Sequence, residues 1–166
     1  MSKSETRPKS EIRNAKRTRI LGVDPGKVRI GLAVTDAERR LASPLTIYAR
    51  KNDEQDEKFF KQIAAGEEIG LLLIGLPMHT TGREGVQADA ARALGAKLQT
   101  WTGLPVLYWD ERFTTRFAES ELWSAGLTHK RRKERRDKVA AQLLLQSYLD
   151  AGCPTAMDQA PSMDEK

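Results

Sequence analysis

The chain has 166 residues, of which 39% are hydrophobic and 31% charged, which suits one well-packed domain and is too short for two large ones. Its single cysteine excludes an intrachain disulfide framework and a cysteine-based zinc site. The net charge of +5 equals the excess of seven Lys/Arg over two Glu in residues 1–19, so the remainder is close to neutral.

The first half of the chain predicts three strands and a helix. Apolar runs of β type indicate strands at 18–24, 28–35 and 43–50, the first two joined by a tight turn at Asp24-Pro25-Gly26. Phe59, Phe60 and Ile63 recur at helical spacing, which predicts a helix over 53–66.

The second half alternates strands and helices. The wholly apolar run 69–76 is typical of a strand buried on both faces, and 105–111 predicts a second such strand. We expect helices at 84–101, 114–125 and 135–150, with a basic loop before the last one. Three strands in hairpin succession followed by two helix–strand crossovers predict an α/β protein with a mixed, five-stranded sheet covered by helices.

Both ends of the chain lack this patterning. Residues 1–17 predict a disordered basic tail, 18–151 the folded domain and 152–166 a flexible tail. No apolar run is long enough to span a bilayer and no h-region stands at the N-terminus, so we expect a cytoplasmic protein without membrane contact.

Acidic residues in apolar surroundings occur at three places. Asp24 ends the first strand, Asp110 and Glu111 end the 105–111 strand, and Asp137 opens the last helix. Each has a structural explanation: Asp24 can cap a turn, and Asp137 can interact with the helix dipole. Alternation puts Asp110 and Glu111 on opposite strand faces, so one of them is expected to face Asp24, and the spacing does not choose between them.

Three converging carboxylates without His or Cys suit hard cations, which predicts Mg²⁺ or Mn²⁺, with two ions together. Two such ions can activate water and stabilise the leaving oxygen of a phosphodiester. Basic and hydroxyl residues near these carboxylates are candidates for nucleic-acid contacts: Lys27, Arg29, Arg83, Arg112, Thr114, Thr115, Arg116, Lys130, Arg131, Arg132, Lys133 and Arg136. Helix capping explains the threonines equally simply. A solvated loop or helix face is the commoner explanation of the basic run.

Four motifs occur in order: Leu21-Gly-Val-Asp-Pro-Gly-Lys-Val-Arg-Ile-Gly31, Ile74-Gly-Leu-Pro77, Asp110-Glu-Arg-Phe-Thr-Thr115, and 130–133 with 137–150. Over 19–150 the chain resembles the YqgF/RuvX family of Holliday junction resolvase-like proteins, which are assigned as pre-16S ribosomal RNA nucleases. The resemblance implies a ribonuclease H-like fold and metal-dependent cleavage of nucleic acid. It makes Asp24, Asp137 and the 110/111 position the metal-binding and catalytic carboxylates, and by analogy with ribonuclease H-like resolvases it favours Glu111.

The resemblance implies an endonuclease that hydrolyses phosphodiester bonds of structured RNA, with precursor 16S rRNA as substrate during ribosome maturation. The alternatives are a Holliday junction resolvase acting on branched DNA, and a non-catalytic RNA-binding or transcription-associated factor on the same fold. Ribosomal or processing proteins are expected partners. The chain is expected to be a monomer or a weak homodimer.

Overall fold

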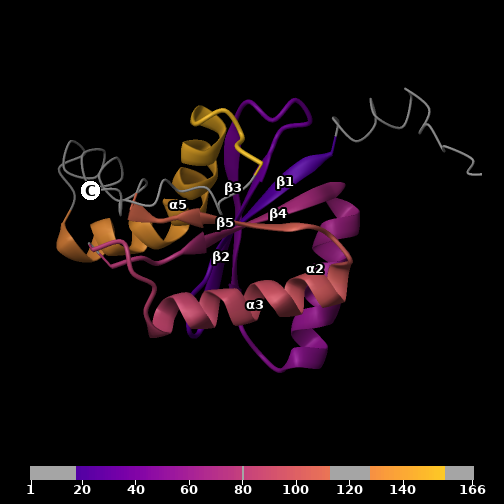
Figure 1. Ribbon diagram of the computed structural model, residues 1–166, viewed down its shortest axis with the longest axis horizontal. Coiled ribbons are helices and arrows are strands. Elements are labelled where there is room, and N and C mark those ends of the chain that lie inside the picture. The colour runs from indigo at the N-terminus through magenta and orange to yellow at the C-terminus, as the bar shows by residue number, and fades with distance from the viewer. Residues whose placement is uncertain (1–17, 80, 113–127, 156–166) are drawn as a thin grey trace, which may run out of the picture.

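The structure is a computed structural model that describes residues 18–79, 81–112 and 128–155. Five strands form one sheet in the order β3-β2-β1-β4-β5 (Figure 1). The strands are β1 (Arg19–Asp24), β2 (Arg29–Thr35), β3 (Ala42–Ala49), β4 (Ile69–Leu76) and β5 (Val106–Asp110). The helices are α2 (Asp53–Gly66), α3 (Val86–Thr102) and α5 (His129–Asp150). The mixed five-stranded sheet with helices is confirmed, and the predicted 114–125 helix lies outside the described residues.

The strand directions bring three carboxyl ends to one edge of the sheet. β1 and β2 are antiparallel with Asp24 opposite Gly31, whereas β4 runs parallel to both β1 and β5. Val23 lies beside Ile74, and Leu76 lies beside Asp110. Asp24 and the 110/111 pair therefore meet at the same edge, separated by β4. Ligand sites in open α/β sheets lie at such edges.

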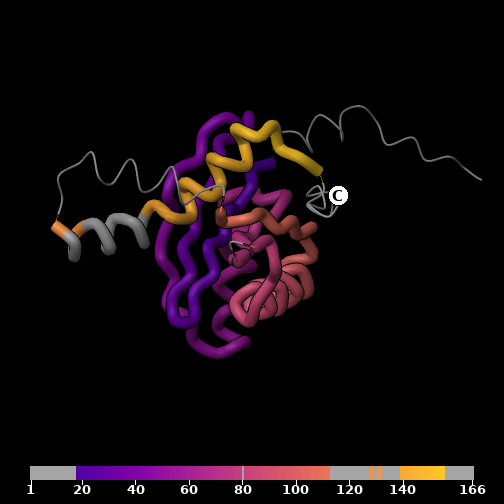
Figure 2. The backbone as a smooth tube through the Cα atoms, turned by 60° about the vertical axis from the view of Figure 1, so that its left-hand side comes forward, coloured from indigo at the N-terminus to yellow at the C-terminus, as the bar shows by residue number. Residues whose placement is uncertain are grey.

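Helices cover both faces of the sheet, as Figures 1 and 2 show. On one face, buried residues of α2 and α3 such as Phe60 and Leu98 pack against alternate residues of β1, β2 and β4. On the other face, Leu144 and Leu145 of α5 pack against Ile20, with Trp109 in the same cluster. Alternate strand residues thus enter two separate apolar clusters, and their burial supplies the main stabilising free energy of the fold.

The last helix begins earlier than the sequence pattern predicts. α5 starts at His129 and not near 135, so the basic run predicted to be a loop is helical. The side chain of Thr128 accepts a hydrogen bond from the backbone amide of Arg131 at 3.4 Å and caps the helix. The run contains no Gly or Pro, and Lys, Arg and Glu favour helices. Its charge density was therefore no argument for a loop.

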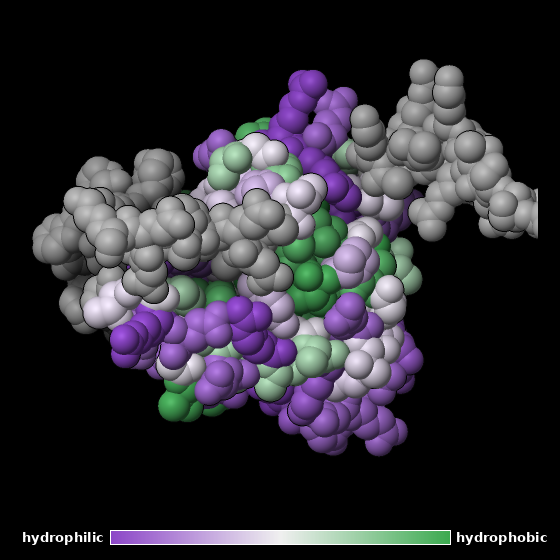
Figure 3. Space-filling model, in the orientation of Figure 1, coloured by the Kyte–Doolittle hydropathy of each residue, from purple (hydrophilic) through white to green (hydrophobic). Residues whose placement is uncertain are grey.

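The surface of the molecule is mostly polar over α2 and more apolar over β5 (Figure 3). Val106 and Leu107 of this edge strand are only partly buried. None of the helices in the described ranges is both long and apolar enough to cross a membrane.

Candidate active site

Asp24 and Glu111 lie on the face of the sheet that α5 covers. Asp24 has the same strand parity as Ile20, which packs against α5. Glu111 has the parity of Trp109, which lies in the same cluster, and its backbone amide donates a hydrogen bond to the carbonyl oxygen of Leu76 at 3.1 Å. This bond extends the β4–β5 ladder one residue beyond the strand. The side chain of Glu111 is thereby directed to the α5 face.

The two carboxyl groups are in contact. Burial of Glu111, the nearby charge of Asp24 and a side-chain hydrogen bond between the two raise the pKa of Glu111 from 4.5 to about 8. The charge of Asp110 raises this pKa further. Two carboxylates in contact repel one another unless a proton or a cation lies between them. Without a cation, the pair therefore tends to retain one proton between the two carboxyl groups.

Gly75 makes room for this pair on the central strand between them. A Cβ atom at Gly75 would lie 2.7 Å from Glu111 Oε1 and 3.1 Å from Leu144 Cδ2. Neither distance is compatible with a side chain unless a neighbour moves. A glycine inside an otherwise apolar strand is a known signal for such close approach, and this residue was not among the predicted site residues.

Asp110 is directed to the other face of the sheet. It is 6% exposed, and its carboxylate accepts hydrogen bonds from Arg112, with Oδ2 lying 2.9 Å from Nε and 2.5 Å from Nη2. The backbone amide of Arg112 donates to Oδ1 at 2.9 Å. Of the two acidic residues that alternation left open, Glu111 is the one in contact with Asp24.

Asp137 lies in the first half of α5, within a stretch whose side chains are outside the description. Its place in the helix is one turn before Ala141, whose carbonyl oxygen would lie 3.3 Å from a Cβ atom on Gly22. Gly22 therefore allows α5 to approach β1 closely, two residues before Asp24. Among the described side chains, no group of three or more His, Cys, Asp or Glu residues is placed to hold a metal ion.

The predicted nucleic-acid-binding residues fall into two sets. Those whose side chains are described are all exposed at the surface: Lys27, Arg29, Arg83, Arg112 and Arg131. Lys27 lies in the turn that follows Asp24, Arg29 is the first residue of β2, and Arg112 follows Glu111 directly. The others lie where side chains are not described: Thr114, Thr115, Arg116, Lys130, Arg132, Lys133 and Arg136.

The mixed five-stranded sheet with helices on both faces has the ribonuclease H-like fold. A solved structure of Thermus thermophilus RuvC in complex with a Holliday junction substrate matches with a TM-score of 0.52 and 15% identity, over 84% of this chain and 98% of that one. The model of the family described as "RuvX: Holliday junction resolvase" matches residues 18–151. The chain therefore belongs to the RuvX family.

Curated relatives match over most of their length. A protein of Rhodopirellula baltica is 41% identical over 133 residues, covering 80% of this chain and 77% of its own. A protein of Protochlamydia amoebophila is 41% identical over 145 residues, covering 83% and 97%. Both are named "Putative pre-16S rRNA nuclease". Family and relatives together assign the chain to the enzymes that hydrolyse nucleic acid.

Proposed function

We propose that this protein is a divalent-metal-dependent endonuclease that cleaves structured RNA, with precursor 16S rRNA as its substrate. The observation that carries the proposal is the contact between Asp24 and Glu111 at the carboxyl edge of β1 and β5. The names of the relatives supply the substrate class. Ribosome maturation is the process in which such an activity acts.

The donor set fits a hard cation. The two described carboxyl groups offer only oxygen ligands, and Gly75 leaves the space beside Glu111 Oε1 that a side chain would fill. We propose that Asp24, Glu111 and Asp137 hold Mg²⁺ or Mn²⁺, with two ions bound together. When bound, such ions supply activation of water and stabilisation of the negative charge that develops at the phosphate.

The chain's own residues bind and orient the substrate. Asp24 and Glu111 define the point of the surface at which the scissile phosphate is held. Lys27, in the turn after Asp24, and Arg29, at the start of β2, are both exposed, and their charges suit the phosphates on either side of that point. Arg83 and the basic run of α5 extend the proposed contact to the neighbouring backbone.

The test is cleavage of end-labelled precursor 16S rRNA by purified protein with Mg²⁺, Mn²⁺ or EDTA. We expect metal-dependent cuts by the wild-type protein and at least a hundredfold lower rate for Asp24→Asn and Glu111→Gln, as expected when a group of the reacting centre is lost. Matched variants at Asp53, an exposed carboxylate paired with Lys97 on the α2–α3 side, serve as the control. If Asp24→Asn cleaves the RNA at the wild-type rate, the proposed site is contradicted.

A second candidate substrate is the four-way DNA junction, favoured by the description of the family model as a Holliday junction resolvase. The chemistry is the same, and only the substrate differs. Rates on a four-way junction and on precursor rRNA, measured with the same protein at one salt concentration, decide between the two. A faster cut of the junction, with symmetric incisions, would favour the resolvase activity.

A further inference from the structure

Asp110 and Arg112 enclose Glu111 in a turn. The Arg112 backbone amide donates to Asp110 Oδ1 at 2.9 Å, so a side chain bonds the backbone two residues further along. Such a turn restrains the residue between its two ends. The amide of Glu111 donates to the carbonyl oxygen of Leu76 at 3.1 Å. The backbone of Glu111 is thus held by β4 on one side and by Asp110 on the other.

The Arg112 guanidinium closes the turn. Its Nε and Nη2 atoms both donate to the Asp110 carboxylate, at 2.9 and 2.5 Å for Oδ2. This charge-assisted pair offsets the cost of burying the carboxylate, which is 6% exposed. Nη1 lies 3.8 Å from the Cβ position of Gly82, in the loop between β4 and α3. The pair therefore also lies against that loop.

The two carboxylates next to each other in the chain have different surroundings. The side chain of Asp110 is directed away from Asp24, and both of its carboxylate oxygens accept hydrogen bonds from Arg112. The side chain of Glu111 contacts Asp24 instead. Removing the Asp110 side chain would leave the backbone amide of Arg112 without its acceptor and the turn without its restraint. The backbone of Glu111 would then keep its hydrogen bond to Leu76 and lose the restraint of the turn.

We propose that Asp110 and Arg112 are positioning residues, which hold Glu111 against Asp24 over Gly75 and do not themselves bind the metal. This proposal rests on the proposed function, because it assigns a role within the same site. Residues that orient metal ligands change metal affinity or rate by about 10- to 100-fold when they are removed.

Two variants of Asp110 separate positioning from direct metal binding. Asp110→Ala removes the acceptor of the turn, and we expect kcat and Mn²⁺ affinity to fall about 10- to 100-fold with KM for nucleic acid unchanged. Asp110→Asn keeps an oxygen that accepts from the Arg112 amide, so we expect it to retain most of both. Amide exchange by NMR should be faster at Arg112 in the alanine variant and close to wild type in the asparagine variant.

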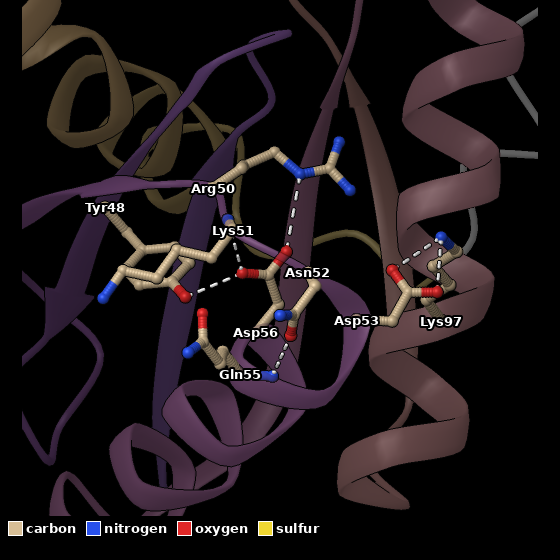
Figure 4. A network of polar contacts seen from close by, with 8 residues as sticks. All are labelled: Tyr48, Arg50, Lys51, Asn52, Asp53, Gln55, Asp56 and Lys97. Carbon is tan, nitrogen blue, oxygen red and sulfur yellow. Dashed lines mark hydrogen bonds and ion pairs between the residues drawn. The ribbon is translucent and has the colours of Figure 1, made fainter.

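Asp56 provides a matched control on α2. Its carboxylate is 2% exposed, accepts from Tyr48 Oη at 2.7 Å and from the Lys51 backbone amide at 3.0 Å, and lies 3.8 Å from Arg50 Nε (Figure 4). Like Asp110, it is therefore a buried carboxylate that accepts a hydrogen bond from a backbone amide and forms an ion pair with an arginine. We expect Asp56→Ala to lose stability while its kcat and Mn²⁺ affinity stay at the wild-type level.

The outcomes distinguish the two proposals. A wild-type kcat in Asp110→Ala, or an increase in KM alone, would overturn the positioning role. So would an Asp110→Asn variant as impaired in Mn²⁺ binding as Glu111→Gln, because a ligand role explains that result. If the wild-type protein cuts no substrate, the proposed function fails, while Mn²⁺ affinity and amide exchange still decide the role of Asp110. If Asp110→Ala does not fold, Asp110→Asn still separates positioning from metal binding, because only a ligand role predicts that this variant loses Mn²⁺ affinity.

Discussion

Gly75→Ala adds one methyl group at the point where Glu111, β4 and α5 meet. The new Cβ would lie 2.7 Å from Glu111 Oε1, 3.2 Å from Glu111 Cγ and 3.1 Å from Leu144 Cδ2. Leu144 is buried in the cluster beneath α5, whereas the carboxyl group of Glu111 is at the end of a longer side chain. We therefore expect Glu111 to move and Leu144 to stay.

Two effects of this substitution can be estimated. Overpacking by one methyl group costs about 1–3 kcal/mol of unfolding free energy, which lowers the melting temperature by several degrees. A displacement of about 1 Å at a reacting centre costs up to about a hundredfold in rate. Because the methyl group is directed at Glu111, we expect the loss of kcat and Mn²⁺ affinity to exceed what the loss of stability explains.

The assay measures urea unfolding, Mn²⁺ affinity and cleavage rate on the same preparations. Gly66→Ala is the control for the glycine change, because no atom lies within 4 Å of its Cβ position. Phe60→Leu is the control for stability, since Phe60 is buried on the opposite face of the sheet. A folded Gly75→Ala protein with wild-type Mn²⁺ affinity and rate would refute the assignment of Gly75 as the residue that accommodates Glu111.

Three further predictions concern charge and docking. In EDTA, the unfolded chain releases the Glu111 proton above pH 4.5, whereas the folded protein, with its pKa raised to about 8, releases it only above that pH. The free energy of unfolding of the wild-type protein therefore falls between these two pH values. Urea titrations over this interval should show Glu111→Gln becoming more stable relative to wild type by up to about 1.4 kcal/mol per pH unit. Gln146→Ala removes the acceptor that lies 2.9 Å from the Ala42 amide and should cost about 1 kcal/mol in the same titration. Replacing Lys27 and Arg29 by alanine should weaken RNA binding and reduce the slope of log affinity against log salt by about 1–2, whereas an unchanged slope would exclude phosphate contacts by both.

The fold was predictable where the hydrophobic pattern had one explanation. The run from Ile69 to Leu76 is short and wholly apolar, and the structure has a strand with those bounds. The start of α5 was not predictable in this way, because a dense basic run has no hydrophobic period. The sequence signals that identify the start of this helix are the capping residue Thr128 and the absence of Gly and Pro from residues 129–138.

The site was predictable in its members and not in its contacts. The alternation of strand residues placed Asp110 and Glu111 on opposite faces of the sheet. To decide which of them faces Asp24, one must know which face α5 covers. One must also know that the β4–β5 hydrogen-bond ladder continues through the Glu111 amide. Both depend on contacts between residues far apart in the sequence. Gly75 could have been found, because a glycine within an apolar strand indicates close approach.

The register of α5 on the sheet gives a physical reason to group Asp137 with Asp24. Gln146 hydrogen-bonds the Arg40 carbonyl, and Gln142, one turn earlier, hydrogen-bonds the Ala42 carbonyl. Moving toward the N-terminus of α5 therefore follows the direction of β3, which is also the direction of β1.

The contact between α5 and Gly22 provides a common point from which distances along β1 and along α5 can be measured. The residues over Gly22 are Ala141 and Leu145. From there, Asp24 lies two residues along β1, a rise of about 7 Å, and Asp137 lies four residues back along α5, a rise of about 6 Å. Measured from Leu145, which also lies over Gly22, Asp137 is eight residues away, a rise of about 12 Å. The grouping of Asp137 with Asp24 therefore requires that α5 runs along β1 from the contact at Ala141. The close approach of α5 at Gly22 thus supports the proposal that Asp137 acts together with Asp24 and Glu111, because the missing side chain of Gly22 lets this helix lie near β1.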